Sequence, residues 1–553
     1  MKRRTLLKQI GITLPALSLS HALQAERLWQ QLAGNEPLLQ GPFQPTWESL
    51  QTYRVPAWYQ NAKFGIWAHW GPQCQPEAGD WYARGMYQEG SRQYKHHLQH
   101  YGHPSSVGFK EVIRQWKAEA WQPEELVALY KQTGARYFMA MANHHDNFDL
   151  YNSKHQQHWN ATRLGPQKDI VGGWAKAAKK MDLPFGVSIH AAHAWSWYEV
   201  TQRSDQHGPM AGIPYDGNST RADGKGTWWE GLDPQELYAQ QHPLSQNSAD
   251  NGMIHRQWDW GNGVCPPSAA YIQNFVNRTI DLINQYEPDI LYFDDSQLPF
   301  WPISDAGLRI AAHHYNRSIK KHGQLRAVIN GKILDEQQRK AMVWDIERGQ
   351  ANDCQPFVWQ TDTCLGDWHY NRAVYDRNGY KPASMVIQTM VDVVSKNGNY
   401  LLNVPVRGNG SIDELERHIL DGIGQWMKRN SECIYDTRPW KIYGEGPSTQ
   451  NQAKLTAQGF NEGKTSYTAQ DIRFTSKNND LYAIVMEWPA DRKVCITSLA
   501  TGKPDMSLQV QQVTWLETQQ PLAFSQTAAG LEVVFPDNAP QQPFAHVLKI
   551  QSH

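Results

Sequence analysis

The sequence predicts an α/β fold, a (β/α)8-like barrel of the TIM type with eight or fewer units, followed by a small antiparallel β-sandwich. Short apolar runs alternate with amphipathic helical stretches along most of the chain, which is typical of parallel β/α units. The runs are too short for helices and too apolar for loops. From Cys433 onward, apolar and polar residues alternate between turn residues, which indicates antiparallel strands.

The apolar runs give the expected barrel strands, and capping residues give the helices between them. Residues 270–286 carry an apolar helical stripe that Pro288 ends, and Asp169 is placed to cap a helix over 170–181. A helix that begins after Gln122 is expected to end at Gly134. The expected strands lie at 64–68, 137–142, 184–189, 290–293, 327–330, 343–349, 357–363 and 398–404.

At 553 residues the chain is too long for one ordinary core, and we expect three segments. These are a signal peptide at 1–25, a catalytic barrel at 26–432 with a long insertion near 191–269, and the β-sandwich at 433–553. The insertion has no clear periodicity, which is unusual for a barrel loop of that length. Its tryptophans either line a sugar-binding groove or pack the loop; they are Trp195, Trp197, Trp228, Trp229, Trp258 and Trp260.

The first residues have the pattern of an export signal. Arg3 and Arg4 precede an apolar run to about Leu19, and small residues follow near Ala25. The paired arginines favour a twin-arginine signal, with an ordinary secretory signal as the alternative. Either form predicts a periplasmic or extracellular bacterial protein whose signal peptide is removed. No other apolar run reaches the ~18 residues of a membrane span, so we expect a soluble mature protein.

The composition limits the classes of binding partner that we expect. The net charge of -1 and the pI near 7.1 give no electrostatic support for nucleic-acid binding. The chain holds 24 tryptophans and 24 tyrosines, which suit stacking on sugar rings or an aromatic-rich core. The six cysteines are scattered without a C-x-x-C pair, so we expect free, buried thiols.

Chemically active side chains follow the expected strands at their carboxyl ends. His69, the pair His144 and His145, His190, and Asp294 stand at such positions. In a β/α barrel these ends converge on one face, where chemistry takes place. Asp294 is therefore our first candidate for a reacting carboxylate, although an acid after a strand can also cap a helix.

Three kinds of site can use this set. A retaining glycosidase needs two carboxylates about 5–5.5 Å apart, one as nucleophile and one as acid/base. A divalent metal could bind His144, His145 and Asp146 with His69 and His190. Adjacent histidines on a strand point in opposite directions, however, which disfavours a shared ion. A third possibility is a protein that binds sugar without turnover.

Several motifs resemble glycoside hydrolase family 29, the α-L-fucosidases. The clearest are A-K-F-G-I-W-A-H-W-G at 62–71, N-H-H-D-N-F at 143–148, D-I-V-G at 169–172, P-D-I-L-Y-F-D at 288–294 and S-K-N-G-N-Y-L-L-N at 395–403. The resemblance implies that Asp294 is the nucleophile of a retaining reaction that needs no metal or other cofactor. Our expected substrate-binding residues are His69, Trp81, Tyr82, His144, His145, His190 and Trp359.

The sequence departs from the family where many members carry the acid/base. The family's Trp-Glu pair reads Trp359-Gln360 here, and glutamine cannot transfer a proton. We therefore expect Glu347 to be the acid/base, with Asp362 as the alternative. The neighbouring Arg348 would depress the pKa of Glu347 if the two were in contact. Lys332 stands near the place of a family arginine.

Together these features predict a retaining exo-glycosidase that removes terminal α-L-fucosyl or closely related L-sugar residues from oligo- or polysaccharides. The alternatives are an α-L-galactosidase on the same scaffold and a non-catalytic carbohydrate-binding protein. The expected partner is the saccharide substrate, with no nucleic acid and no membrane span, and the oligomeric state stays open.

Overall fold

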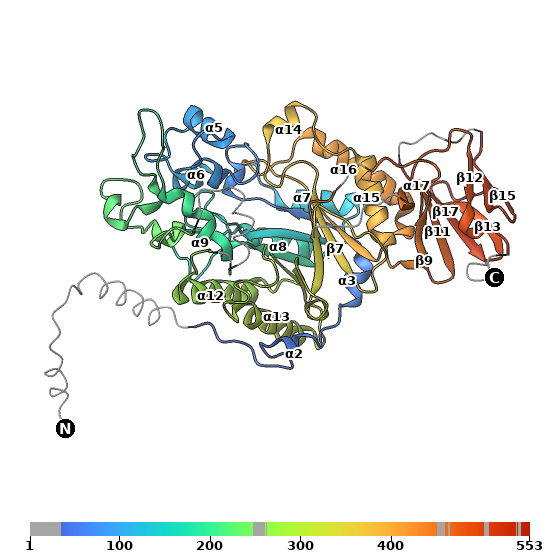
Figure 1. Ribbon diagram of the computed structural model, residues 1–553, viewed down its shortest axis with the longest axis horizontal. Helices are drawn as coiled ribbons and strands as arrows, with labels where there is room; N and C mark the ends of the chain where they lie inside the picture. The colour runs from blue at the N-terminus through green and yellow to red at the C-terminus, as the bar shows by residue number, and fades with distance from the viewer. Residues whose placement is uncertain are drawn as a thin grey trace, which may run out of the picture.

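The computed structural model describes residues 35–246, 260–261, 263–450, 459–462, 465–502, 508–537, 539 and 544–552 (Figure 1). The expected signal peptide and Trp258 lie outside these residues. None of the described helices combines the length and apolar character that a membrane crossing requires.

The centre of the molecule is a closed barrel of eight parallel strands, which confirms the predicted fold class and completes its strand count. β1 closes the barrel by pairing with both β2 and β8, with Gly65 opposite Tyr137 and Ile66 opposite Leu402. The strands are β1 Phe64–Ala68, β2 Tyr137–Asn143, β3 Phe185–Ile189, β4 Ile290–Phe293, β5 Val328–Gly331, β6 Val343–Glu347, β7 Trp359–Cys364 and β8 Gly398–Asn403.

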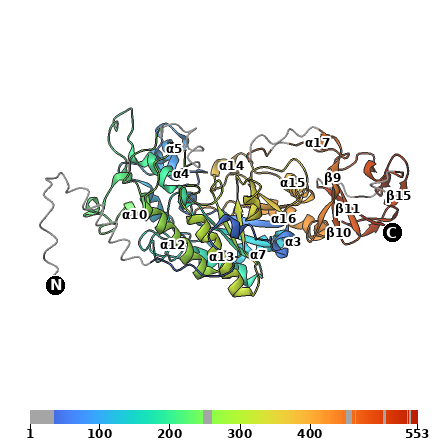
Figure 2. The same ribbon diagram turned by 60° about the horizontal axis from the view of Figure 1, so that its bottom comes forward.

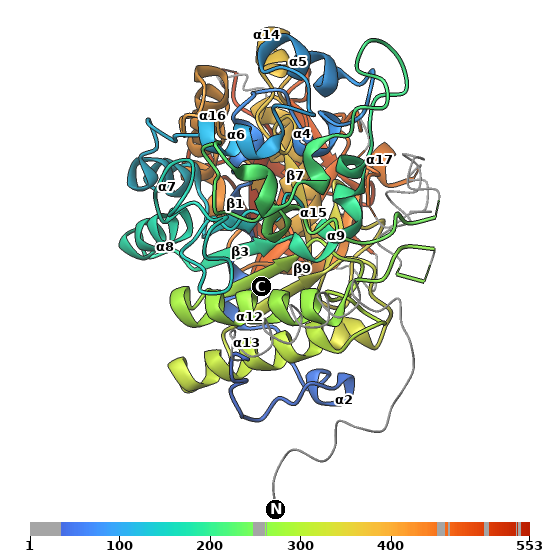
Figure 3. The same cartoon turned by 90° about the vertical axis from the view of Figure 1, so that its left-hand side faces the viewer.

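Helices surround the barrel, and the expected capping residues set their ends (Figure 3). Asp169 accepts from the Gly172 amide at 2.8 Å where α8 begins, and Gly134 ends α7 with φ of 111°. The helices are α2 Trp47–Leu50, α3 Ala57–Ala62, α4 Tyr82–Gly85, α5 Arg92–His100, α6 Phe109–Gln115, α7 Pro123–Thr133, α8 Ile170–Lys180, α9 Ala194–Trp197, α10 Gln235–Tyr238, α12 Ala269–Tyr286, α13 Ala306–His322, α14 Arg372–Asp376, α15 Ala383–Ser395, α16 Glu414–Asn430 and α17 Pro447–Gln450.

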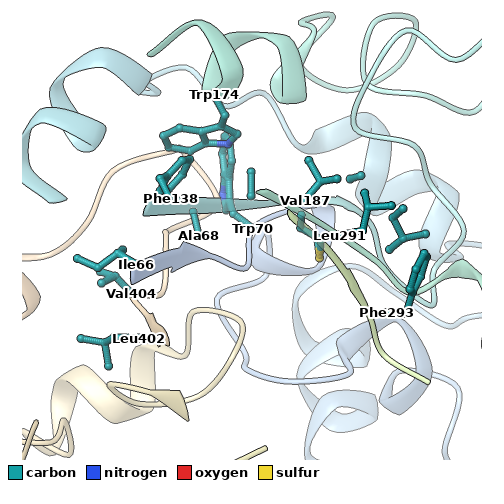
Figure 4. Packing of buried hydrophobic residues seen from close by; sticks show 14 of the residues in the cluster. Ile66, Ala68, Trp70, Phe138, Trp174, Val187, Leu291, Phe293, Leu402 and Val404 are labelled. Atoms are coloured by element: carbon teal, nitrogen blue, oxygen red, sulfur yellow. The ribbon is translucent and has the colours of Figure 1, made fainter. Parts of the chain in front are cut away.

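Alternate residues of each strand serve two separate cores. One set, including Ile66, Phe138 and Leu291, faces the helices and belongs to the same cluster as Trp174 of α8 (Figure 4). The other set fills the barrel, with Trp67 and Tyr292 among it. This two-residue period fixes which side chains can reach the mouth of the barrel.

The C-terminal region forms two antiparallel sheets with their own apolar core, as predicted (Figure 2). β9 and β10 lie against α15, where Arg473 Nε donates to Asp392 Oδ1 at 2.6 Å. The larger sheet contains β9 Arg438–Glu445, β10 Ile472–Lys477, β11 Asp480–Val485, β13 Val510–Trp515, β14 Gln520–Pro521 and β17 His546–Ser552; the smaller contains β12 Lys493–Ile496, β15 Ala523–Gln526 and β16 Leu531–Val534.

The tryptophans of the region between β3 and α12 pack both on its own residues and on neighbouring segments; Trp197 lies against Tyr198 and also against Trp81, His144 and His145. Trp197 is fully buried, and Trp195, Trp229 and Trp260 are at most 9% exposed. These four tryptophans therefore pack the segment, and Trp197 also lies beside His144 and His145 at the strand ends. The six cysteines are free, as expected, but only Cys74, Cys364 and Cys433 are buried; Cys265 is half-buried, and Cys354 and Cys495 are exposed.

Candidate active site

The two-residue period of the strands carries side chains from the barrel interior up to its mouth. Tyr292 faces the interior, and two residues later Asp294 follows the end of β4. The same count leads from Asn330 to Lys332 after β5, and from Asp345 to Glu347 at the end of β6. The carboxyl ends of neighbouring parallel strands meet at one face, so these groups converge.

Lys332 links the two carboxylates of the predicted catalytic pair. Its Nζ donates to Asp294 Oδ1 and to Glu347 Oε2. The two acceptor oxygens therefore lie no more than two hydrogen-bond lengths apart, about 6 Å. The Asp294 and Glu347 side chains keep 19% and 17% exposure, so both remain reachable from the mouth.

His145 holds the second oxygen of Asp294. Its Nε2 lies 3.0 Å from Asp294 Oδ2, and its Nδ1 lies 2.8 Å from the His190 carbonyl. The His190 contact orients the imidazole ring so that Nε2 faces the carboxylate. Both oxygens of Asp294 are thus fixed in position, one by a lysine and one by a histidine.

The surroundings of the two carboxylates push their pKa values in opposite directions. Burial alone would raise the pKa of Asp294, but the charge of Lys332 and the His145 hydrogen bond hold it well below its usual range. Burial raises the pKa of Glu347 to about 7; Lys332 opposes this shift and the Asp294 charge adds to it. One group is suited to stay ionised and the other to carry a proton near neutral pH.

Asp362, the alternative acid, lies deeper in the barrel. It pairs in register with Glu347 but is only 1% exposed, and its Oδ2 accepts from the Tyr292 hydroxyl at 2.9 Å. Burial and the neighbouring Asp345 carboxyl raise its pKa well above the usual range. Glu347 is the better placed of the two to meet a substrate.

Three predicted histidines line the mouth beside these acids. Gln73 donates to His144 Nδ1 at 2.8 Å, so the proton of a neutral His144 sits on Nε2. His190 Nδ1 lies 3.0 Å from the Asn143 carbonyl, which leaves its Nε2 as an acceptor. Burial lowers the pKa of His69, His144 and His190, the last to about 3. Neutral imidazoles with both donors and acceptors suit sugar hydroxyls.

A fourth histidine, His369, joins this group from the loop after β7 and was not expected. Its ring centre lies 4.8 Å from those of both His69 and His144. Neither of its ring nitrogens has a hydrogen-bond partner among the described residues, and its side chain is fully buried. Asp80 positions the loop by accepting from the His369 amide at 2.7 Å.

One nitrogen from each of His69, His144 and His369 lies within 4.8 Å of the others, so these residues could hold a metal ion. When three imidazole nitrogens bind one zinc ion, each at about 2.0–2.1 Å, the nitrogens lie closer to one another than 4.8 Å. The set proposed from sequence differs: His145 points to Asp294 while His144 faces Gln73, as adjacent residues on a strand should.

The structure corrects two expected substrate contacts. Trp359 begins β7 at the opposite end of the strand from the mouth, and its Nε1 donates to the Lys396 carbonyl at 2.9 Å. Tyr82 is fully buried in α4, where its hydroxyl lies 2.9 Å from His97 Nδ1. Its neighbour Trp81 remains partly exposed and lies with its ring centre 6.0 Å from that of Trp197.

Gln360 does not lie at the mouth of the barrel, and Arg348 is not the cation that contacts Glu347. The Gln360 amide is buried in the barrel, donating to Asp345 Oδ1 at 2.8 Å and accepting from the Tyr59 hydroxyl at 2.6 Å. Arg348 lies 3.7 Å from the Glu462 carboxylate, and the cation in contact with Glu347 is Lys332. Gln360 is thus a structural group below the mouth.

This placement predicts the outcome of Gln360→Glu. The variant should not raise activity, because residue 360 does not reach the mouth, and it should lose roughly 2 kcal/mol or more of stability by burying a third carboxyl beside Asp345. Denaturant unfolding and an assay of aryl-glycoside hydrolysis measure both effects, with Gln360→Met as the uncharged control. A variant that is as stable as wild type and more active would contradict the placement.

Comparison with known proteins identifies the family. The family model described as alpha-L-fucosidase matches residues 31–432, which is well over half of the chain. The chain belongs to the α-L-fucosidase family. The model of the α-L-fucosidase C-terminal domain matches residues 465–551, which include most of the antiparallel sheets.

Individual family members are distant in sequence but similar over most of their length. The tissue α-L-fucosidase of Rattus norvegicus is 23% identical over 82% of this chain and 81% of its own. The α-L-fucosidase of Dictyostelium discoideum is 21% identical over 92% and 94%. The crystal structure of Thermotoga maritima α-fucosidase in complex with fucose matches with a TM-score of 0.65 at 23% identity, covering 92% of this chain and 100% of that one.

Proposed function

We propose that this α-L-fucosidase family member removes terminal α-L-fucosyl residues from oligo- or polysaccharides with retention of configuration, Asp294 acting as nucleophile and Glu347 as acid/base. The observation that supports this most is the carboxylate pair joined through Lys332. A spacing of about 6 Å or less between the oxygens suits the double displacement of a retaining enzyme and leaves little room for the water of an inverting one.

In the first step Asp294 Oδ attacks the anomeric carbon. Glu347 donates its proton to the glycosidic oxygen, the bond between that oxygen and the anomeric carbon breaks, and a fucosyl ester forms on Asp294. In the second step Glu347 takes a proton from water, the water oxygen attacks the anomeric carbon, and Asp294 leaves as a carboxylate. The low pKa of Asp294 suits both its attack and its departure.

Lys332 supports the change of role by Glu347 between these steps. In the free enzyme the negative charge of Asp294 raises the pKa of Glu347, while Lys332 opposes it. Esterification removes the charge of Asp294 but leaves that of Lys332. The pKa of Glu347 then falls, so that the group that entered as an acid becomes the base that the second step requires.

The histidines and Trp81 bind the sugar in this account. His144 offers a donor and His190 an acceptor, while His69 and His369 bring further ring nitrogens without partners among the described residues. Trp81 supplies an aromatic face at the rim. We further propose that residues 1–25 direct export and are then removed.

Substrate preference tests the proposal directly. Hydrolysis of an aryl α-L-fucoside in preference to an aryl α-L-galactoside, with α-L-fucose as the first product in proton NMR, is the expected result. Preference for the galactoside would reassign the sugar. Binding of fucose without hydrolysis of either glycoside would make the protein a carbohydrate-binding module and overturn the assignment.

Lys332→Met should move the pH profile of kcat/KM toward higher pH on both limbs. Lys332 lowers the pKa of both carboxylates. Its loss should therefore raise both pKa values and shift the acidic limb, set by Asp294, and the basic limb, set by Glu347, to higher pH. We expect a fall of at least about 10-fold in kcat/KM at neutral pH. Lys332→Arg keeps the charge and should restore the position of the profile; an unshifted profile in the methionine variant would contradict the role of the charge.

A further inference from the structure

A short segment of the C-terminal region lies against the acid/base residue. Residues 459–462 belong to the connection between β9 and β10, yet the Phe460 amide donates to the Glu347 carbonyl at 2.7 Å. The Glu462 amide donates to the Arg348 carbonyl at 2.8 Å, and Asn461 Oδ1 accepts from the Gln350 amide at 3.0 Å. The segment therefore follows the backbone just beyond β6.

Side chains secure this contact. Glu462 Oε1 accepts from Thr363 Oγ1 at 2.8 Å and from Lys381 Nζ at 2.5 Å. Gly459 has φ of 116°, and a Cβ there would lie 2.9 Å from the Glu347 carbonyl oxygen, so the close approach depends on a glycine. The barrel thus fixes the segment at both of its ends.

Phe460 is unusual in this setting. Its φ of 53° is costly for a bulky side chain, and the residue is 67% exposed, the highest value among the large apolar residues described. Residues held in this strained conformation cluster at functional sites, which favours a functional role for Phe460. The hydrogen bond from the Phe460 amide to the Glu347 carbonyl places this exposed aromatic residue next to the proposed acid/base.

We propose that Phe460 forms the subsite for the sugar that departs, a pyranose ring joined to the fucosyl group through the bond that is cleaved. This inference rests on the proposed function, because it takes Glu347 as the acid/base. The leaving oxygen must lie within hydrogen-bond reach of Glu347, so its sugar ring extends past that residue. A phenyl ring held there by backbone hydrogen bonds can stack on the apolar face of the pyranose at little entropic cost.

The subsite gives the C-terminal region a part in catalysis. The residues that bind the fucosyl group follow the barrel strands, whereas Phe460 arrives from the connection between two sandwich strands. Selectivity for the leaving sugar can then change in that connection without change to the barrel mouth.

Phe460→Ala tests the subsite with two substrates that share a glycosyl group but differ in what leaves. The first substrate is the best of a panel of α-1,2-, α-1,3- and α-1,6-linked fucosyl hexopyranosides. Its kcat/KM should fall about 3- to 10-fold in the variant. For α-L-fucosyl fluoride, whose leaving group has no ring, kcat/KM should stay within about 2-fold of wild type. Phe460→Tyr keeps a stacking face and should behave as wild type on both.

The controls separate this inference from the proposed function. Val534→Ala removes an apolar side chain of 42% exposure on β16 and should leave both substrates unchanged. Equal losses on the fluoride and the disaccharides, or no loss on any disaccharide, would overturn the subsite. If the wild-type protein hydrolyses neither substrate, the proposed function itself fails.

Discussion

Replacement of Asp294 by alanine should lower kcat/KM for an aryl α-L-fucoside by on the order of 10⁵-fold. Without the carboxylate no ester can form, and water would have to attack with no group to stabilise the developing positive charge. Asp294 has both oxygens engaged, by Lys332 and His145, so the loss also leaves these two groups without their shared partner. Stopped-assay kinetics over long incubations measure a decrease of this size.

The product formed with added azide shows which role was removed. Azide can enter the space left in Asp294→Ala and attack the anomeric carbon directly, which should give β-L-fucosyl azide. Asp305→Asn, an exposed acid before α13, is the matched control and should keep wild-type kinetics. Retention of more than a few per cent of wild-type activity by Asp294→Ala would contradict its role as nucleophile.

Replacement of Glu347 by alanine should lower kcat/KM by about 10²- to 10⁴-fold for glycosides whose leaving oxygen needs a proton. The loss should be much smaller for a leaving group of low pKa, such as a dinitrophenolate. Azide should restore turnover by taking the place of water in the second step, and the product should be α-L-fucosyl azide because the ester on Asp294 still forms. Product NMR distinguishes the two anomers.

Asp362→Ala is the discriminating comparison for this assignment. Asp362 is buried below Glu347, against Tyr292, so its loss should cost stability more than it changes the response to azide. Azide rescue of Asp362→Ala, with none of Glu347→Ala, would transfer the acid/base role to the deeper carboxyl.

The pH dependence follows from the same pair. The first step needs Glu347 protonated, so kcat/KM should fall as the pH rises through the pKa of about 7 that burial gives this group. Asp294 must be ionised, and its depressed pKa keeps it so across the acidic range. In Glu347→Ala the basic limb should disappear, while the acidic limb should stay at low pH.

The barrel and the positions of its reacting ends could be predicted because they depend on local patterns. Ile290–Phe293 is apolar and bounded by Pro288 and Asp294, which predicts a strand whether or not its neighbours are known. The strand ends at His69, His190 and Asp294 could be aligned on one face because parallel strands leave no other arrangement.

Trp359 could have been excluded by counting along its strand. Side chains alternate, so Gln360 and Asp362 facing inward places Trp359 outward, against Lys396. The same count from Val328 through Asn330 leads to Lys332. The resemblance to the family drew attention only to the arginine that Lys332 replaces, and not to the position of its side chain at the mouth. The signal for Lys332 was present in the period of the strand.

His369 and Phe460 had no such signal. His369 lies in a loop, and Phe460 lies more than 100 residues from Glu347, to which its amide is bonded. Local periodicity cannot predict contacts of this kind. They depend on how the C-terminal sheets pack against α15, which brings the connection between β9 and β10 back to the barrel.

Covalent trapping tests the central claim most directly. A 2-deoxy-2-fluoro-α-L-fucosyl fluoride forms its ester with the nucleophile but loses it slowly, so the enzyme can be digested and the modified peptide sequenced by mass spectrometry. The account predicts a single adduct on Asp294, absent from Asp294→Ala. An adduct on Glu347 or Asp362, or steady turnover of substrate with no adduct at all, would contradict it.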